Sequence, residues 1–292
     1  MIISHIIGGL GNQMFQYALG RSLSLARGVP LKLDTTDFSG YELHQGFQLA
    51  RVFSVPAEEA TYDDVAVMLG WRRYRIVRRI MGRPGLSIVR GKRLIVESYL
   101  DYWDGIHQVP AYCYLSGYWQ SERYFQEYRQ EIRSDFTFRK PLSGQNQEWS
   151  RLIRGVISVS LHIRRGDYVR NPETNAVHGL CSIDYYQSAA RHIAELVEAP
   201  EFFVFSDDIS WARENLNLDY PCHYICENLD EDSYIDMQLM SLCCHHIIAN
   251  SSFSWWGAWL NPRDDKIVVA PHKWFSRKPR PRDLLPDRWV IL

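Results

Sequence analysis

Apolar runs separated by short polar turns at the N-terminal end of the chain predict a strand, a helix and a second strand. Residues 2–7 form a short apolar run, and a helical apolar stripe follows over residues 14–26. Gly28 and Pro30 are expected to end this helix, and residues 31–34 are expected to form the next strand. The order strand, helix, strand is typical of a parallel α/β domain.

The same alternation is clearer in the C-terminal half. The predicted strands are 156–163, 202–206, 246–249 and 266–270, and the predicted helices are 183–197, 211–216, 233–243 and 254–260. Alternation at this spacing predicts a doubly wound parallel sheet. Between residues 40 and 150 the pattern mixes short helices with aromatic strands such as 112–116. We therefore expect two α/β domains, residues 1–150 and 151–292.

Composition narrows the class of protein. The chain has 292 residues, 46% of them apolar, which is enough for two modest domains. Its formal net charge of −1 gives no general attraction to nucleic acid or membrane. The 10 tryptophans and 17 tyrosines fit either large cores or flat surfaces that stack on sugars. Of the six cysteines, Cys222 and Cys226 are closely spaced, but no second pair completes a zinc site, which favours reduced thiols in a cytoplasmic protein.

Charged residues follow the first predicted strand of the C-terminal half. This strand ends in His162, Arg164 and Arg165, and Asp167 comes soon after. Ligands bind at the carboxyl ends of strands in open α/β sheets, and guanidinium groups bind phosphate or carboxylate at two points. Because neighbouring side chains on a strand alternate in direction, we expect one arginine to face the ligand. The other is expected to form a structural ion pair, Arg165 with Asp167.

Two more strand ends in this half carry polar side chains. Asp207 and Asp208 follow the second strand, where a carboxylate could bind a metal, ribose or a guanine edge, or Asp208 could cap the next helix. Residues 250–254 follow the third strand and run into a helix, where hydroxyl and N–H groups form a phosphate cradle. A plain helix cap by Ser252 or Ser254 is the alternative. Three such ends in one parallel sheet point to a nucleotide with phosphates.

A glycine-rich turn follows the first strand of the chain. It contains Gly9, Gly11, Asn12 and Gln13, and it resembles a dinucleotide fingerprint except that Met14 stands where a third glycine belongs. The glycines allow a ligand to approach the backbone, and the start of the following helix favours negative charge. An ordinary turn between strand and helix fits the segment equally well.

These segments resemble those of the inverting α1,2-fucosyltransferases of glycosyltransferase family 11, mainly of bacteria. The matching segments are Gly-Gly-Leu-Gly-Asn-Gln-Met-Phe-Gln-Tyr-Ala at 8–18, His-Ile-Arg-Arg-Gly-Asp-Tyr at 162–168, Phe-Ser-Asp-Asp at 205–208, 236–241 and 248–260. The resemblance implies a GT-B fold, in which two Rossmann-like domains with parallel sheets face each other across a cleft. It also implies GDP-β-L-fucose as donor, the 2-hydroxyl of a galactose in a glycan as acceptor, and no required metal or other cofactor.

The resemblance also assigns roles to residues on the donor side. Arg164 would hold the β-phosphate as a catalytic group, and His162 with Asp207 or Asp208 would recognise the guanosine. The remaining donor-side residues would be Arg165, Asn250, Ser251, Ser252, Phe253 and Ser254. An arginine and a helix start can stabilise the leaving GDP without a metal, and Asp207-Asp208 is not the Asp-x-Asp pattern of metal-using transferases.

The acceptor side is expected in the N-terminal domain, at Gly9, Gly11, Asn12 and Gln13. Asn12 is expected to orient the acceptor, and Asp167 belongs with Arg164 and Asn12 in the expected catalytic set. An inverting displacement usually needs a carboxylate to accept a proton, and Asp34 and Asp37 are candidates by position alone. A GDP-fucose transferase of another linkage or acceptor, and a non-catalytic glycan-binding protein, are the alternatives.

A basic segment lies outside these motifs. Residues 71–93 contain no Asp or Glu, and in a helix Trp71, Tyr74, Val77 and Met81 would share one face. This pattern is typical of a helix that lies on an anionic membrane surface. It would place the protein at the inner face of the cytoplasmic membrane, near lipid-linked glycan acceptors. A solvated basic helix that packs by its apolar stripe is the alternative.

Overall fold

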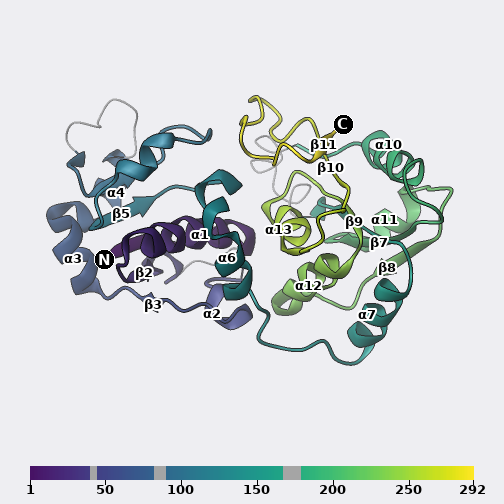
Figure 1. Ribbon diagram of the computed structural model, residues 1–292, viewed down its shortest axis with the longest axis horizontal. Helices are drawn as coiled ribbons and strands as arrows, with labels where there is room; N and C mark the ends of the chain where they lie inside the picture. The colour runs from purple at the N-terminus through teal and green to yellow at the C-terminus, as the bar shows by residue number, and fades with distance from the viewer. Residues whose placement is uncertain (40–44, 82–89, 167–178) are drawn as a thin grey trace. The chain divides into compact units, whose positions relative to one another are not determined.

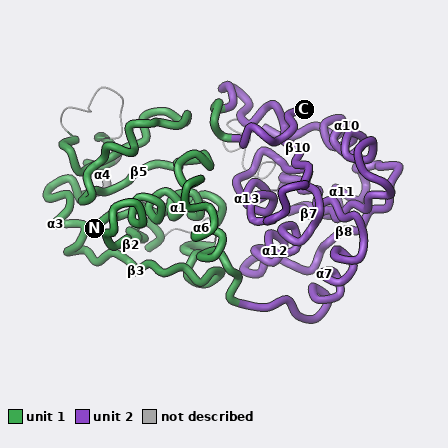
Figure 2. The backbone as a smooth tube through the Cα atoms, in the orientation of Figure 1, with its two compact units in different colours: residues 1–139, 281–284 green, residues 140–280, 285–292 purple. Residues whose placement is uncertain are grey.

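The chain folds into two compact α/β units. The computed structural model describes residues 1–39, 45–81, 90–166 and 179–292. The first unit contains residues 1–139 and 281–284, and the second contains residues 140–280 and 285–292 (Figure 2). Residue 150, where the sequence suggested a boundary, lies inside a helix of the second unit.

The described part of the first unit is built on a five-stranded parallel sheet in the order β3-β2-β1-β5-β4 (Figure 1). Its strands are β1 (Ile2–His5), β2 (Leu31–Asp34), β3 (Glu58–Glu59), β4 (Leu94–Val96) and β5 (Cys113–Ser116). Its helices are α1 (Leu10–Arg27), α2 (Leu49–Val52), α3 (Tyr62–Leu69), α4 (Arg75–Met81) and α6 (Arg129–Asp135). The predicted strand, helix, strand opening is confirmed. Gly28 ends α1 in the left-handed conformation, at a φ of 62°, which glycine adopts without strain.

The second unit is built on a sheet of six parallel strands within the described residues, in the order β11-β10-β9-β6-β7-β8 (Figure 1). The strands are β6 (Ser158–Ile163), β7 (Glu201–Ser206), β8 (Cys222–Ile225), β9 (His245–Ile247), β10 (Val268–Ala270) and β11 (Val290–Ile291). The helices are α7 (Gln145–Gly155), α10 (Ile183–Ala194), α11 (Ile209–Asn215), α12 (Tyr234–Leu242) and α13 (Ser252–Leu260). All six residues of β6 are buried, as expected for a central parallel strand covered on both faces. The predicted parallel α/β sheet is confirmed.

Three helices begin earlier than the sequence suggested. Helix α1 begins at Leu10, so Asn12 and Gln13 lie in its first turn and not in a loop. Asp208 caps α11, which confirms the capping alternative for that residue. Helix α13 begins at Ser252 with Ser251 as its cap, so the alternative of a cap by Ser252 or Ser254 was wrong. In the latter two helices the cap side chain accepts a backbone N–H that lacks a partner within the helix.

Most tryptophans among the described residues are buried in the cores. Trp255, Trp256 and Trp259 of α13 are buried, and their rings contact one another at centroid distances of 5.0 to 6.3 Å. Trp119 is also buried, in the first unit. A sugar-stacking surface therefore does not explain these residues. Each of the six cysteines is a free thiol.

The basic segment does not form one continuous helix. A 3-10 turn at Gly70–Arg73 precedes α4, and residues 82–89 lie outside the described part. Met81 is buried and Val77 packs against the core, whereas Trp71 and Tyr74 are 55% and 53% exposed. The single helix that would place all four residues on one face does not form, because the break before α4 separates Trp71 and Tyr74 from Val77 and Met81. Among the described residues, no helix has the length and apolar character needed to cross a membrane.

Candidate active site

Three polar strand ends meet at one edge of the second sheet. Strand β6 pairs in parallel with β7 on one side and with β9 on the other, so the carboxyl ends of all three lie together. Ile163 is opposite Ser206, and Leu161 is opposite Ile247. The residues that follow these strands are those singled out in the sequence as donor-binding candidates. The carboxyl edge of a parallel sheet is the usual ligand position in open α/β folds.

Asp207 holds the end of β6 in place. Its Oδ2 lies 3.3 Å from Nη1 of Arg164, and its carboxylate accepts the backbone N–H groups of Arg165 and Gly166. Burial opposes ionisation, but the Arg164 charge and these N–H groups lower the pKa of Asp207 below its usual value. Asp207 therefore stays anionic and positions Arg164, whose side chain remains 24% exposed and open to a ligand.

Arg165 has different partners from Arg164. Its guanidinium lies 4.1 Å above the ring of Trp211 and 4.0 Å from Oδ2 of Asp208. Oδ1 of Asp208 accepts the backbone N–H of Trp211 at 3.2 Å and so caps α11. The two arginines thus have different surroundings. Asp167, the expected partner of Arg165, lies outside the described residues. The expected catalytic role of Asp167 therefore stays a prediction.

His162 is a buried neutral ring beside these charges. It is 5% exposed, and its Nδ1 has no hydrogen-bond partner in the described part of the chain. Burial and the charge of Arg164 lower its pKa to about 3, although Asp207 acts in the opposite direction. The ring lies 5.8 Å from that of Phe253, which links the ends of β6 and β9. A buried ring nitrogen without a partner is a natural hydrogen-bonding group for a ligand.

The segment after β9 divides into structural and accessible residues. Asn250 is buried and donates from Nδ2 to the carbonyls of Gly179 and Trp274, each at 3.2 Å. Ser254 is buried as well. Ser251 is partly exposed, like Ser252 and Phe253, and its Oγ accepts the N–H of Phe253 at 3.3 Å. Asn250 thus anchors the loop, and residues 251–253 at the start of α13 are the part open to an anion.

The first strand end of the chain belongs to the first unit. Gln13 is fully buried and its amide is used internally, with Nε2 donating to the carbonyls of Gly8 and Gly46 and Oε1 accepting the N–H of Gln48. Gln13 is thus placed to hold the loops rather than to meet a substrate. Asn12 is partly exposed, and its Oδ1 accepts from Nε2 of Gln120 at 2.8 Å. Gly9 is the N-cap residue of α1 and has no side chain to accept a hydrogen bond. Gly11 is buried within the helix.

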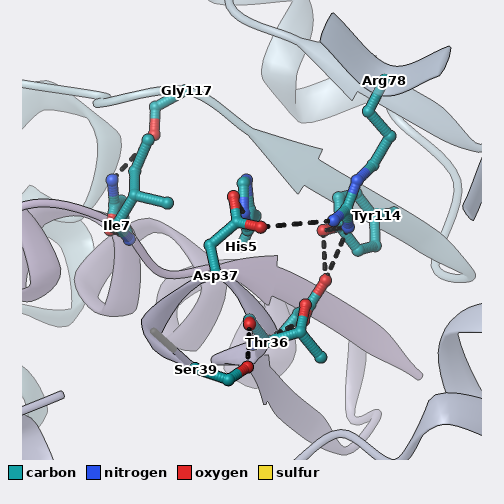
Figure 3. Close-up of polar contacts among 10 residues, drawn as sticks. His5, Ile7, Thr36, Asp37, Ser39, Arg78, Tyr114 and Gly117 are labelled. Carbon is teal, nitrogen blue, oxygen red and sulfur yellow. Dashed lines mark hydrogen bonds and ion pairs between the residues drawn. The ribbon is translucent and has the colours of Figure 1, made fainter. Parts of the chain in front are cut away.

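Asp34 and Asp37, the position-based candidates for a proton acceptor, lie in a network of ion pairs. Figure 3 shows Asp37 and Arg78 of this network. Asp34 is fully buried, forms an ion pair with Arg78 at 2.7 Å and accepts from Tyr114 and Thr36. Burial alone would raise its pKa, but these partners lower it to about 2. Asp37 pairs with His5 at 3.1 Å. Asp34 is a buried structural anion, and one charge of the basic segment, Arg78, is used to neutralise it.

Glu97 and Gln120 stand at this edge of the first sheet and were not identified from the sequence. Glu97 directly follows β4, and its carboxylate accepts the N–H groups of Tyr118 and Trp119. The apolar triplet 94–96 before a carboxylate was the available signal, but so short a strand inside a basic segment is easily missed. Among the described residues, no cluster of three or more His, Cys, Asp or Glu could hold a metal ion.

Known proteins resemble the chain over almost its whole length. An alpha-1,2-colitosyltransferase of Escherichia coli is 39% identical over 99% of this chain and 98% of the relative. The O-antigen biosynthesis glycosyltransferase WbnK of Escherichia coli is 34% identical over 99% of both chains. A galactoside alpha-(1,2)-fucosyltransferase 1 of Leontocebus fuscicollis is 25% identical over 97% of this chain and 72% of the relative.

The fold also has solved counterparts. The fucosyltransferase NodZ from Bradyrhizobium superposes with a TM-score of 0.54 at 15% identity, over 88% of this chain and 91% of NodZ. This likeness and the two parallel-sheet units confirm the expected α/β, GT-B-like fold. The model of glycosyl transferase family 11 matches residues 97–290. Together with the two Escherichia coli relatives, this match shows that the chain is a glycosyltransferase and belongs to glycosyltransferase family 11.

Proposed function

We propose that the chain transfers L-fucose from GDP-β-L-fucose to the 2-hydroxyl of a galactose unit, with inversion at the anomeric carbon of the fucose. The main supporting observation is the convergence of Arg164, neutral His162 and the start of α13 at one sheet edge. Arg164 and the N–H groups of residues 251–253 stabilise the charge that develops on the leaving GDP. His162 and Asp208 contact the guanosine. Asn12 orients the acceptor, and no metal takes part.

A close variant of this donor is the second candidate. The Escherichia coli relative that is 39% identical is named an alpha-1,2-colitosyltransferase. Colitose is 3-deoxy-L-fucose, so the two donors share the GDP group and differ by one hydroxyl. The phosphate and guanosine contacts proposed above serve both donors equally. Initial rates with GDP-fucose and GDP-colitose on the same galactoside decide between them.

The acceptor is a galactose-containing O-antigen unit or a similar lipid-linked glycan. Support comes from the relative WbnK, whose name assigns it to O-antigen biosynthesis. Peripheral contact with the cytoplasmic face of an anionic membrane is part of this proposal, because Trp71, Tyr74, Ile76 and Ile80 are exposed within a basic segment. Co-flotation with phosphatidylglycerol liposomes at low salt, and none with phosphatidylcholine, is the expected result. Failure to float with either removes the membrane contact.

Nucleotide-specific stabilisation tests the donor. GDP at a hundredfold excess over its Kd should raise the melting temperature by roughly 5 °C, and UDP and ADP should not. Turnover of GDP-fucose or GDP-colitose should require a galactoside and persist in EDTA. Stabilisation by galactosides without any GDP effect would instead indicate a glycan-binding protein. A GDP effect with turnover only on other acceptors would indicate a different linkage or acceptor.

A further inference from the structure

Glu97 lies at the sheet edge where the first unit presents its other polar loops. Strands β1, β5 and β4 are adjacent and parallel, and Val96 pairs opposite Ser116. The residues that follow these strands therefore lie at one edge, with Glu97 next to the segment after β5. Glu97 is partly exposed, so its carboxylate is held by the protein without being sealed from a ligand.

The segment after β5 is shaped around this carboxylate. Oε2 of Glu97 accepts the N–H of Tyr118 at 2.7 Å, and Oε1 accepts the N–H of Trp119 at 2.9 Å. A Cβ on Gly117 would lie 2.4 Å from Cβ of Glu97, so only glycine permits this approach. Gln120, which directly follows Trp119, donates from Nε2 to Oδ1 of Asn12. The same four-residue segment thus orients Glu97 and the asparagine proposed to orient the acceptor.

The electrostatic surroundings of Glu97 differ from those of the other carboxylates at this edge. Asp34 and Asp37 are each paired with a cationic or basic side chain, whereas Glu97 forms no ion pair in the part of the chain that the structure describes. Burial raises the pKa of Glu97 to about 7, opposed only by the two backbone N–H groups. Tyr124 is a titratable side chain near Glu97. Burial and, to a smaller extent, this carboxylate raise the pKa of Tyr124, which favours the neutral phenol.

We propose that Glu97 is the general base of the transfer, an assignment that rests on the function proposed above. The Glu97 carboxylate accepts the proton of the acceptor hydroxyl as the hydroxyl oxygen bonds to the sugar C1. The bond between C1 and the phosphate oxygen breaks, and its electron pair leaves with GDP. Glu97 ends protonated and returns its proton to water. A carboxylate whose proton affinity lies near neutrality is suited to this task.

Substitution of Glu97 provides the first test. Glu97→Gln and Glu97→Ala should each lower kcat by at least about a hundredfold. GDP should raise the melting temperature of both variants as in the wild type, because the GDP contacts lie in the second unit. Glu58→Gln, an 84% exposed glutamate of the same sheet, should retain full activity. Wild-type kcat in Glu97→Gln overturns the assignment, whereas a wild type that turns over no GDP-sugar overturns the proposed function instead.

The pH dependence separates a base from a merely structural carboxylate. Wild-type kcat should fall about tenfold per pH unit below pH 7, as Glu97 becomes protonated. In Glu97→Ala, sodium formate should restore kcat at least tenfold and extend activity below pH 6, because formate is a weaker base that fits the vacated space. An unchanged pH profile in Glu97→Ala, or no response to formate in a variant that still binds GDP, means that Glu97 only positions the segment.

Discussion

The Arg164 side chain is partly exposed, and its guanidinium is held in a fixed position. Asp207 holds it from one side, and Asp207 is itself held by two backbone N–H groups. An arginine positioned before the ligand arrives loses little side-chain entropy on binding. His162 beside it is neutral, so it adds hydrogen-bonding capacity without repelling the guanidinium. Of these two side chains, Arg164 alone is charged, so the proposed phosphate contact depends on Arg164 and not on His162.

Removal of this guanidinium should nearly abolish transfer. Arg164→Ala is expected to lower kcat by about a hundredfold to a thousandfold and to weaken GDP binding, because the leaving phosphate loses its cation. Arg191→Ala, which removes an exposed arginine from α10 in the same unit, is the matched control and should change neither quantity. Activity assays and titration with GDP measure both effects. Near-normal GDP affinity in Arg164→Ala would refute the phosphate contact.

Gly166 should tolerate no side chain. A Cβ there would lie 2.9 Å from the main-chain oxygen of Asp207, and a backbone atom cannot move aside cheaply. Gly166→Ala is expected to lower the free energy of unfolding by about 1–3 kcal/mol and to weaken GDP binding by displacing Arg164. Gly155→Ala is the control, since a Cβ at Gly155 meets no atom within 4 Å. Equal stability and GDP affinity in the two variants would show that the loop after β6 is adaptable.

At the start of α13, the residue that caps the helix, Ser251, also belongs to the segment proposed to bind phosphate. Ser251→Ala removes the cap of Phe253 N–H and should lower stability by about 1 kcal/mol. Ser182→Ala removes the equivalent cap from α10 and should have a similar effect on stability. Only Ser251→Ala should also weaken GDP binding, because only that helix start is proposed to meet phosphate. A loss of GDP affinity in both variants would assign the effect to general destabilisation.

The strands that carry the proposed donor site were largely predictable, because their pattern is local. A buried parallel strand is a continuous apolar run, so 156–163 and 202–206 marked β6 and β7, and the polar residues after them marked the sheet edge. The helix starts were less accurate. The capping alternative for Asp208 was confirmed, but α13 is capped by Ser251, because neighbouring serines are equally plausible caps. Short strands such as β4 contain too few residues for a recognisable apolar pattern. Glu97, which follows β4, was therefore not identified from the sequence.

Contacts between distant segments could not be predicted from local pattern. Arg78 lies in a segment that suggested a membrane surface, yet it neutralises buried Asp34 forty-four positions away. The segment 281–284 returns to the first unit, where Asp283 pairs with Arg123 and accepts the N–H of Tyr102. Such pairings are decided by the whole fold, since charged side chains near a core need a partner that any segment can supply. The first unit is consequently not a continuous piece of chain.

Stability of the whole molecule should depend on pH through its carboxyl groups with raised pKa. Burial raises the pKa of Asp236 to about 7, although Asn228 donates to its Oδ1 at 2.7 Å. A folded-state pKa above the unfolded value means that the contribution of Asp236 to stability is greatest below about pH 4. It is lost as pH rises to 7. Buried histidines such as His162, whose pKa is lowered, change stability with pH in the opposite direction. The difference in unfolding free energy between the wild type and an Asp236 variant therefore isolates the contribution of this carboxyl.

Asp236→Asn keeps an oxygen acceptor for Asn228 and removes the ionisation. Relative to the wild type, its free energy of unfolding should rise with pH between about 4 and 7, by up to about 1.4 kcal/mol per pH unit, and then level off. Denaturant unfolding of both proteins at each pH measures this difference. Asp232→Asn, at an exposed position in the preceding turn, is the matched control for the loss of one carboxyl group. A flat difference for Asp236→Asn would mean that this carboxyl ionises as readily in the folded protein as in the unfolded chain.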